Sequence, residues 1–293
     1  MRKVCALVLG CLLAAAGFAH PGSGIAVDRK GNVYFVDTGS GPWKIDTRGR
    51  ITRQPGQRFH WLALDERDRF ATARLPAGSA GDIERSGSSP TLLLSSDYPI
   101  LIGGDGNLYN SMSGIAGLLM MRRTPSGASS VLATLPTNKT QQWINGIAAG
   151  LKGEIYYTQD NAICKITPKG RVSTVATIAK VAGARPVPGI SADLGPYLRG
   201  LAVDARGYVY VAASGDGRVL LVTPDGKATT KYQAQTPWSP TAVALHGRTL
   251  YVLEYRHAEG DDRRVWLPRV RRIEAGGKST IIATVAQMPG ARR

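Results

Sequence analysis

The sequence predicts an all-β fold, a six-bladed β-propeller of four-stranded antiparallel blades, and three observations carry this prediction. Apolar runs of three to five residues, rich in Val and Tyr and too short for helices, alternate with tight-turn sequences. The phrase Gly-(Ile or Leu)-Ala-Val-Asp recurs ahead of a turn and a second apolar run. The residue that turns the chain before each second strand recurs six times, 37 to 54 residues apart, which indicates a repeated unit.

Residues 200–226 show the unit most clearly. Three apolar runs, 201–203, 208–212 and 219–222, are separated by turns that end in Gly207, Gly217 and Gly226. Glycine supplies the positive φ that such turns need. A fourth run, 229–232, completes an antiparallel meander, and stacked copies of that meander around an axis form a propeller.

The other units follow in order, with the first strand of each predicted to be innermost. Blade one spans 24–53 and blade three spans 99–133. Blade two is degenerate, with strands expected at 60–65, 69–73, 83–85 and 91–94. Blade four spans 145–176, and blade six begins at 241 and ends at 283. The insertions 179–197 and 255–264 have loop composition or high charge, and the first is expected over one face of the disc.

Residues 1–19 are predicted to be a signal peptide, which leaves one propeller domain at 20–293. A basic start precedes an apolar run at 4–16 that is too short to span a bilayer, and the small residues Gly17 and Ala19 occupy positions −3 and −1 of a cleavage site. The alternatives are a buried first helix and a lipoprotein anchored at Cys11. Cleavage predicts an exported protein, periplasmic or secreted, with no transmembrane segment. Cys164 is then the only cysteine, and a small buried hydrophobe is its favoured role.

The repeat phrase, closed by Pro-x-Gly, resembles the NHL repeat. More broadly, the chain is similar to the six-bladed senescence-marker-protein/gluconolactonase and strictosidine-synthase-like superfamily. The likeness covers nearly all of residues 22–285 and is strongest in blades one, four and five. It is informative about the fold and much less so about function, because propellers host many chemistries.

A ligand site is predicted at one mouth of the central channel. The start of strand one and the end of strand two lie at the same end of a meander, so these positions converge from all blades. Polar side chains at these positions are the predicted ligand-binding residues: Asp37, Arg74, Asn145, Asp160, Arg199, Glu254 and Tyr255.

The gluconolactonase-like resemblance implies a divalent cation such as calcium at this mouth, held by oxygen ligands. Asn145, followed by Gly146 and Ile147, matches one ligand position of the family. The position before blade one, at 22–23, has no carboxylate, and the position before blade five is Arg199, a cation. Asn145 is therefore the only candidate metal ligand that the family pattern supplies. Asp37, Asp160 and Glu254 are a weaker oxygen set, and hydrogen bonds to loop amides or pairing with Arg74 and Arg199 are favoured for them.

The sequence offers two further candidate sites, a catalytic carboxylate and a zinc site. The strictosidine-synthase-like resemblance makes Glu254, at the end of a last-blade strand, the candidate catalytic residue, and a structural carboxylate neutralised by Arg256 is the favoured alternative. His20, His60, His246 and His257 lack ligand spacing, so a zinc-dependent lyase site is set aside.

Charge adds one more candidate surface. The net charge of +16 favours acidic partners. The Arg-rich stretch 256–272 with Trp266 is expected to be an outward solvated strand. If this stretch binds a partner, an anionic envelope surface or an acidic glycan is expected rather than nucleic acid, because export separates the protein from the nucleic acid of the cytoplasm.

The sequence therefore predicts an exported propeller that acts as a binding module for a small molecule, glycan or protein at the channel mouth. The alternative is a gluconolactonase-like, metal-dependent hydrolase with an altered metal site. Enzymatic activity, of a lactonase or ester-hydrolase type, stays open and is not favoured.

Overall fold

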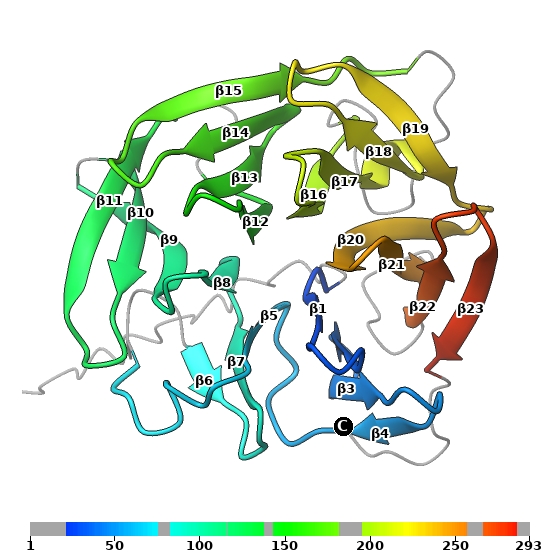
Figure 1. Cartoon of the computed structure of the whole chain (residues 1–293), viewed down its shortest axis with the longest axis horizontal. Coiled ribbons are helices and arrows are strands. Elements are labelled where there is room, and N and C mark those ends of the chain that lie inside the picture. Colours follow the sequence, from blue (N-terminus) through cyan, green and yellow to red (C-terminus); the bar gives the residue numbers. More distant parts are fainter. Residues whose placement is uncertain are drawn as a thin grey trace, which may run out of the picture.

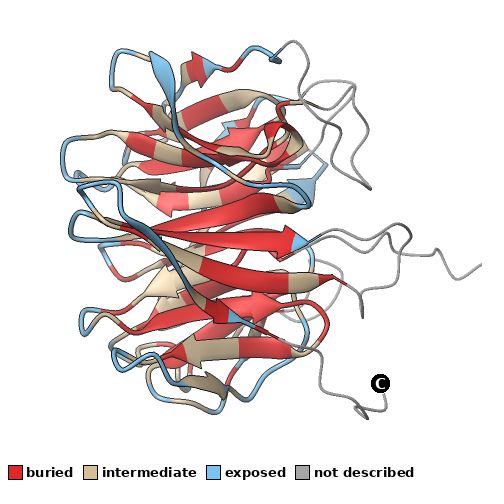
Figure 2. Cartoon of the chain, turned by 90° about the vertical axis from the view of Figure 1, so that its right-hand side faces the viewer, coloured by how far each residue is buried: buried red, intermediate tan, exposed pale blue. Residues whose placement is uncertain are grey.

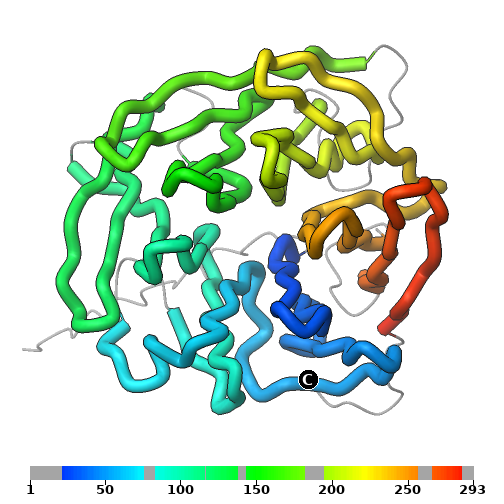
Figure 3. Tube along the Cα trace, in the orientation of Figure 1, coloured from blue at the N-terminus to red at the C-terminus, as the bar shows by residue number. Residues whose placement is uncertain are grey.

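Six antiparallel sheets surround a central axis in the computed structural model of this chain (Figure 1). The structure describes residues 22–75, 83–115, 117–137, 143–181, 195–256 and 266–285. The predicted signal segment 1–19, His20, His257 and most of both insertions lie outside the described residues. Each blade starts with its first strand next to the axis and steps outward, as the chain trace in Figure 3 shows. The predicted six-bladed propeller is confirmed.

Five blades are four-stranded meanders. Blade one holds β1 (Ile25–Val27), β2 (Val33–Asp37), β3 (Gly41–Ile45) and β4 (Ile51–Arg53). Blade three holds β8 (Ile100–Ile102), β9 (Leu108–Gly114), β10 (Gly117–Arg123) and β11 (Ser129–Leu135). Blade four holds β12 (Gly146–Ala149), β13 (Ile155–Gln159), β14 (Ala162–Ile166) and β15 (Val172–Thr177).

The last two blades carry the longest first strands. Blade five holds β16 (Leu198–Val203), β17 (Val209–Ala213), the 3-10 turn η2 (Ser214–Asp216), β18 (Arg218–Val222) and β19 (Ala228–Gln233). Blade six holds β20 (Trp238–His246), β21 (Thr249–Arg256), β22 (Leu267–Ile273) and β23 (Ser279–Thr284).

Blade two departs from the prediction. Its described strands are β5 (Trp61–Asp65), β6 (Ile83–Arg85) and β7 (Thr91–Ser95), in the spatial order β5-β7-β6. The strand predicted at 69–73 is wrong because the Asp65 carboxylate accepts the Phe70 N–H at 2.7 Å and folds this segment into turns. The Asp68 carboxylate then accepts the Thr91 N–H at 2.6 Å, which brings β7 beside β5.

Apolar side chains between neighbouring blades hold the disc together. In Figure 2 the buried residues fill the middle of the disc, and exposed residues gather at the turns and outer strands. The second strands are buried on both faces; all five residues of β2 and of β13 are buried. Burial of this kind stabilises a propeller by roughly 25 cal/mol for each Å² of apolar surface removed from water.

The ring closes by side-chain packing between blades six and one. Phe35 and Val33 pack with Tyr255, Leu253 and Val270 in one buried cluster. The Tyr255 hydroxyl donates to the Val36 carbonyl, and the Thr241 hydroxyl donates to the Gly22 carbonyl, both at 2.7 Å. Within the described ranges each of these two blades is built from its own consecutive strands, so closure involves no exchanged strand.

Glycine at the start of three first strands allows the neighbouring blade to approach closely. A Cβ on Gly200 would lie 2.6 Å from the Ala242 Cβ, and one on Gly146 would lie 2.5 Å from the Arg199 carbonyl oxygen. A Cβ on Gly24 would lie 2.6 Å from the Leu62 nitrogen. Real Cβ atoms do not come this close to other heavy atoms, so these positions exclude every side chain. The repeat phrase begins with glycine for this reason.

We expect Gly200→Ala to lower the free energy of unfolding by about 1–3 kcal/mol, because overpacking forces the contact with Ala242 apart. Urea unfolding followed by fluorescence measures the change. The matched control is Gly276→Ala, since a Cβ there meets nothing within 4 Å. Equal unfolding midpoints for the two variants would contradict the proposed close contact.

Candidate functional site

The predicted mouth holds buried polar side chains at equivalent positions in different blades. Ser23, Asn145 and Arg199 each precede one of the three tightly packed glycines. Their relative exposures are 7%, 5% and 3%. Their positions place them at the channel end of the innermost strands, which the convergence argument predicted. This part of the predicted site therefore has a common structural origin.

Arg199 lies on β16 and is the buried cation of this end. Burial lowers the pKa of its guanidinium from the ordinary value, and the phenols of Tyr197 and Tyr255 oppose that change. The guanidinium carbon lies 5.9 Å from the centre of the Tyr197 ring, within the range of a cation–π contact. This buried side chain places a positive charge where the family pattern expects an anion.

Asn145 and Ser23 each carry a buried polar atom that has no hydrogen-bond partner among the described residues. The Asn145 Oδ1 accepts the Trp143 indole N–H at 3.1 Å, while its Nδ2 has no hydrogen-bond partner among the described residues. The buried Ser23 hydroxyl is likewise without a partner there. Leaving such a group unsatisfied costs about 1–3 kcal/mol, and sites of this kind mark a place for a ligand or water.

Asp37, Asp160 and Arg74, which were also predicted to bind the ligand, lie in surroundings different from those of Asn145. The Asp37 carboxylate accepts the Gly39 N–H at 2.9 Å and the Ser40 hydroxyl, so loop groups satisfy it as the structural interpretation expected. Asp160 is half-buried in the turn after β13, at a φ of 51°. Arg74 is exposed at the end of the segment that forms no strand. Among the residues that the structure describes, no hydrogen bond or ion pair joins these three side chains to Asn145.

Glu254 belongs to an ion-pair network between blades five and six. Its side chain is fully buried, and its Oε2 accepts the Nε groups of Arg269 at 2.6 Å and Arg271 at 3.2 Å. The Tyr232 hydroxyl donates to Oε1 at 2.7 Å, and burial together with Glu254 raises the pKa of that phenol. Arg269 also lies 3.9 Å from the Trp238 ring centre. Arg269 and Arg271, not Arg256, neutralise this carboxylate.

This network also determines how far the arginines of the basic stretch 256–272 are exposed. The side chains of Arg269 and Arg271 are only 7% and 12% exposed, and Trp266 is buried. The expectation of an outward solvated strand is therefore wrong for these residues, because β22 pairs with β21 and brings Arg269 opposite Glu254. The predicted envelope or glycan contact of this stretch stays a prediction.

The residues at the mouth do not fit a divalent metal. Ser23 and Arg199 occupy two of the three family ligand positions, and the third, Asn145, has its amide oxygen on Trp143. Across the described ranges no group of three or more His, Cys, Asp or Glu side chains is arranged to hold a metal ion. A fixed guanidinium repels a dication. No catalytic step through a metal follows from this arrangement.

The remaining chemistry-bearing residues are dispersed. The His60 Nδ1 lies 2.6 Å from the Ser96 carbonyl near the mouth, whereas His246 is the last residue of β20, at the other end of the channel. Cys164 is buried on β14, and burial raises the pKa of its thiol, which agrees with the structural role predicted for it. The described part of the chain has no helix with the length and apolar character of a membrane span.

Sequence analysis missed a cavity along the channel. It has a volume of about 400 Å³ and is lined by the six innermost strands, starting two residues beyond Ser23, Asn145 and Arg199. It extends to the tight turns at the opposite end of those strands, where Arg29, Glu66, Arg67 and Arg69 lie. In the sequence, the apolar strands that line the cavity cannot be distinguished from core strands. The cavity becomes evident only when the six strands are arranged in a ring.

Comparison with known proteins confirms the predicted resemblance. The family model described as SMP-30/Gluconolactonase/LRE-like region matches residues 116–255, just under half of the chain. Virginiamycin B lyase from Nocardia farcinica is 26% identical over 199 residues, which cover 64% of this chain and 65% of that protein. The chain thus spans slightly less than two thirds of this curated relative.

Solved propellers share the fold at low identity. Regucalcin from Agrobacterium tumefaciens, a calcium-binding protein, superposes with a TM-score of 0.57 at 18% identity, covering 83% of this chain and 85% of that one. Virginiamycin B lyase from Staphylococcus aureus gives 0.53 at 17%, covering 88% and 83%. A gluconolactonase from Xanthomonas campestris gives 0.55 at 12%, covering 80% and 83%. The chain is a six-bladed propeller, and its residues 116–255 are similar to the SMP-30/Gluconolactonase/LRE-like region.

We expect Glu254→Gln to lower the free energy of unfolding by about 3–5 kcal/mol, because it leaves the buried Arg269 and Arg271 charges uncompensated. Chemical denaturation measures the loss. Glu274→Gln is the matched control, since Glu274 pairs with Arg272 at 3.3 Å with both side chains 42% exposed, and it is expected to change stability by less than about 1 kcal/mol. A stable Glu254→Gln protein would contradict the structural role.

Proposed function

We propose that this protein is a binding module that holds a small polar molecule at the mouth formed by Ser23, Asn145 and Arg199. The observation that carries the proposal is a buried Asn145 Nδ2 without a partner among the described residues, in the same ring position as the buried Arg199 guanidinium. Nδ2 and the guanidinium are donors, and the Ser23 hydroxyl donates as well. The ligand class is therefore a small molecule rich in acceptor oxygens, such as a sugar acid.

The propeller relatives support a small-molecule site without naming its ligand. A calcium-binding protein, a gluconolactonase and lyases of virginiamycin B are built on this ring. In this chain a guanidinium and a hydroxyl stand where the metal-dependent pattern needs anions. This favours binding without a metal over the gluconolactonase-like hydrolase. A lyase of the virginiamycin B type is a second candidate, which the 26% identity to the Nocardia protein favours.

We expect EDTA, calcium, zinc and manganese to leave the thermal midpoint of the purified protein unchanged, and D-gluconate or an oligogalacturonate to raise it by several degrees. Binding at 100 times Kd stabilises a native state by about 2.7 kcal/mol, and each kcal/mol shifts the midpoint of a chain this size by about 2–4 °C. Differential scanning fluorimetry gives the midpoints. Asn145→Ala is expected to remove the shift.

The control is Asn107→Ala, whose side chain bonds Asp105 in a turn at the other end of the channel. A rise with one metal that Asn145→Ala abolishes would replace the binding proposal with the hydrolase. Cleavage of virginiamycin B by the protein would replace it with the lyase. A midpoint that neither anion changes would leave the mouth without its proposed ligand class and overturn the proposal.

We also propose that the protein is exported. The support is the basic start, the apolar run at 4–16 and the small residues Gly17 and Ala19 at positions −3 and −1 of the cleavage site. When the full chain is expressed in a Gram-negative host, the periplasmic fraction is expected to contain a protein that starts at His20. Fractionation and N-terminal sequencing check this. Replacing Leu9 with Arg is expected to retain the full-length chain in the cytoplasm, and an intact Met1 in the periplasm would contradict cleavage.

A further inference from the structure

Trp143 exposes an aromatic ring at the mouth. Among the described residues it is the only exposed tryptophan, and its relative exposure is 54%. It lies two residues before Asn145, just ahead of the first strand of blade four. Its indole N–H donates to the Asn145 Oδ1 at 3.1 Å, which ties the ring to the buried amide. A large exposed ring held beside an unsatisfied polar atom is typical of a binding surface.

The same hydrogen bond fixes which atom Asn145 offers to a ligand. An indole N–H can only donate, so the amide must present its oxygen to Trp143. The Nδ2 donor is then the atom left without a partner among the described residues. In the absence of the indole N–H, either end of the amide could meet the ligand, because the two ends have nearly the same shape. Trp143 therefore makes Asn145 a donor toward the ligand.

A second aromatic ring stands at the equivalent position of blade five. Tyr197 lies two residues before Arg199, the same spacing as in blade four. Its half-buried ring is 5.9 Å from the Arg199 guanidinium carbon, and its φ of 48° is in the left-handed region that bulky residues rarely adopt. The Ser214 N–H donates to the Tyr197 carbonyl at 3.1 Å and holds this backbone in place. Each of the two donors, on neighbouring blades, thus has an aromatic ring beside it.

We propose that Trp143 selects a sugar acid in its closed ring form, such as a uronic acid at the end of a glycan chain. The sugar carboxylate accepts from Arg199, an oxygen of the ring or a hydroxyl accepts from the Asn145 Nδ2, and the C–H face of the pyranose packs on the indole. An open-chain sugar acid offers the same oxygens without that face. This inference rests on the function proposed for the mouth and specifies the form of its ligand.

Isothermal titration calorimetry of the purified protein with methyl α-D-galactopyranosiduronate and with sodium D-gluconate tests the proposal. The glycosidic methyl group locks the first sugar as a ring, whereas gluconate is an open chain. Packing roughly 50–60 Å² of apolar ring surface on the indole corresponds to about a tenfold gain, so the galactosiduronate is expected to bind about tenfold more tightly. Methyl α-D-galactopyranoside, which lacks the carboxylate, is expected to bind at least about tenfold more weakly than the galactosiduronate.

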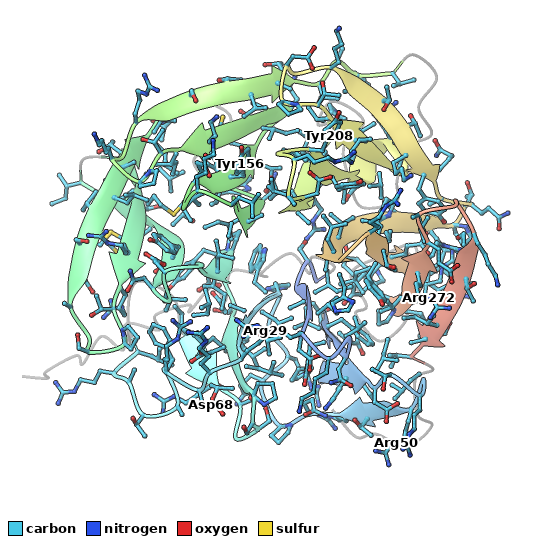
Figure 4. All side chains as sticks on the ribbon, in the orientation of Figure 1. Arg29, Arg50, Asp68, Tyr156, Tyr208 and Arg272 are labelled. Atoms are coloured by element: carbon cyan, nitrogen blue, oxygen red, sulfur yellow. The ribbon has the colours of Figure 1, made fainter. Side chains whose placement is uncertain are left out.

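Two substitutions separate the indole ring from its N–H. Trp143→Ala removes both and is expected to abolish the preference for the ring form over gluconate. Trp143→Phe keeps an aromatic face and removes the donor, so it is expected to retain the preference and to weaken both acids several-fold. The matched control is Tyr208→Ala, at the tight turn before β17, where the ring lies 4.5 Å from the Arg206 guanidinium carbon (Figure 4). This control is expected to leave both affinities unchanged.

Fluorescence quenching by acrylamide gives a second measurement on the same proteins. Because Trp143 is the exposed indole, it is expected to contribute most of the quenching. Saturating galactosiduronate is expected to reduce quenching in the unsubstituted protein and to leave it unchanged in the Trp143→Phe variant. Thermal melts establish that all variants fold.

Two kinds of result are distinguished. Equal affinities for the ring and open-chain acids, or a preference that Trp143→Ala leaves unchanged, would overturn the role of Trp143 and keep the mouth as a site for sugar acids. The absence of binding of both acids to the unsubstituted protein would remove the function proposed for the mouth together with this inference.

Discussion

The close approach of neighbouring innermost strands is the contact on which this ring depends. Gly24, Gly146 and Gly200 give the next blade room that no side chain allows. The residue before each of these glycines sits at the inner edge of the ring, where the blades converge. The motif that identifies the fold therefore also determines where Ser23, Asn145 and Arg199 lie. Scaffold and candidate site follow from one packing constraint.

Buried polar groups near this mouth are of two kinds, those that bond one blade to the next and those with an atom that lacks a partner among the described residues. Thr158 donates to the Arg199 carbonyl at 2.8 Å and Ser239 donates to the Ser214 carbonyl at 2.7 Å, and both bonds tie adjacent blades together. Tyr255 closes the ring in the same way. Asn145 and Ser23 keep an atom outside this network. A buried donor without a partner gains free energy when a ligand or water supplies one.

The sequence predicts the repeat well because apolar runs and glycine turns are local signals. It fails in blade two because Asp65 and Asp68 use their side chains to bond backbone amides, and such bonds compete with a strand. It pairs Glu254 with the wrong arginine because Arg256 is near in sequence, whereas antiparallel register puts Arg269 opposite. The cavity could not be predicted because its wall residues are indistinguishable from core until six strands meet.

The exchange of a metal ligand position for Arg199 changes what chemistry the mouth supports. A bound dication polarises a carbonyl and lowers the pKa of water, so it can drive hydrolysis. A guanidinium offers charge and several N–H donors in a rigid plane, but it carries no empty coordination site for a nucleophile. Recognition of acceptor oxygens survives this exchange, whereas Lewis-acid activation does not. The buried arginine at this position therefore supports the proposed binding function over a metal-dependent hydrolysis.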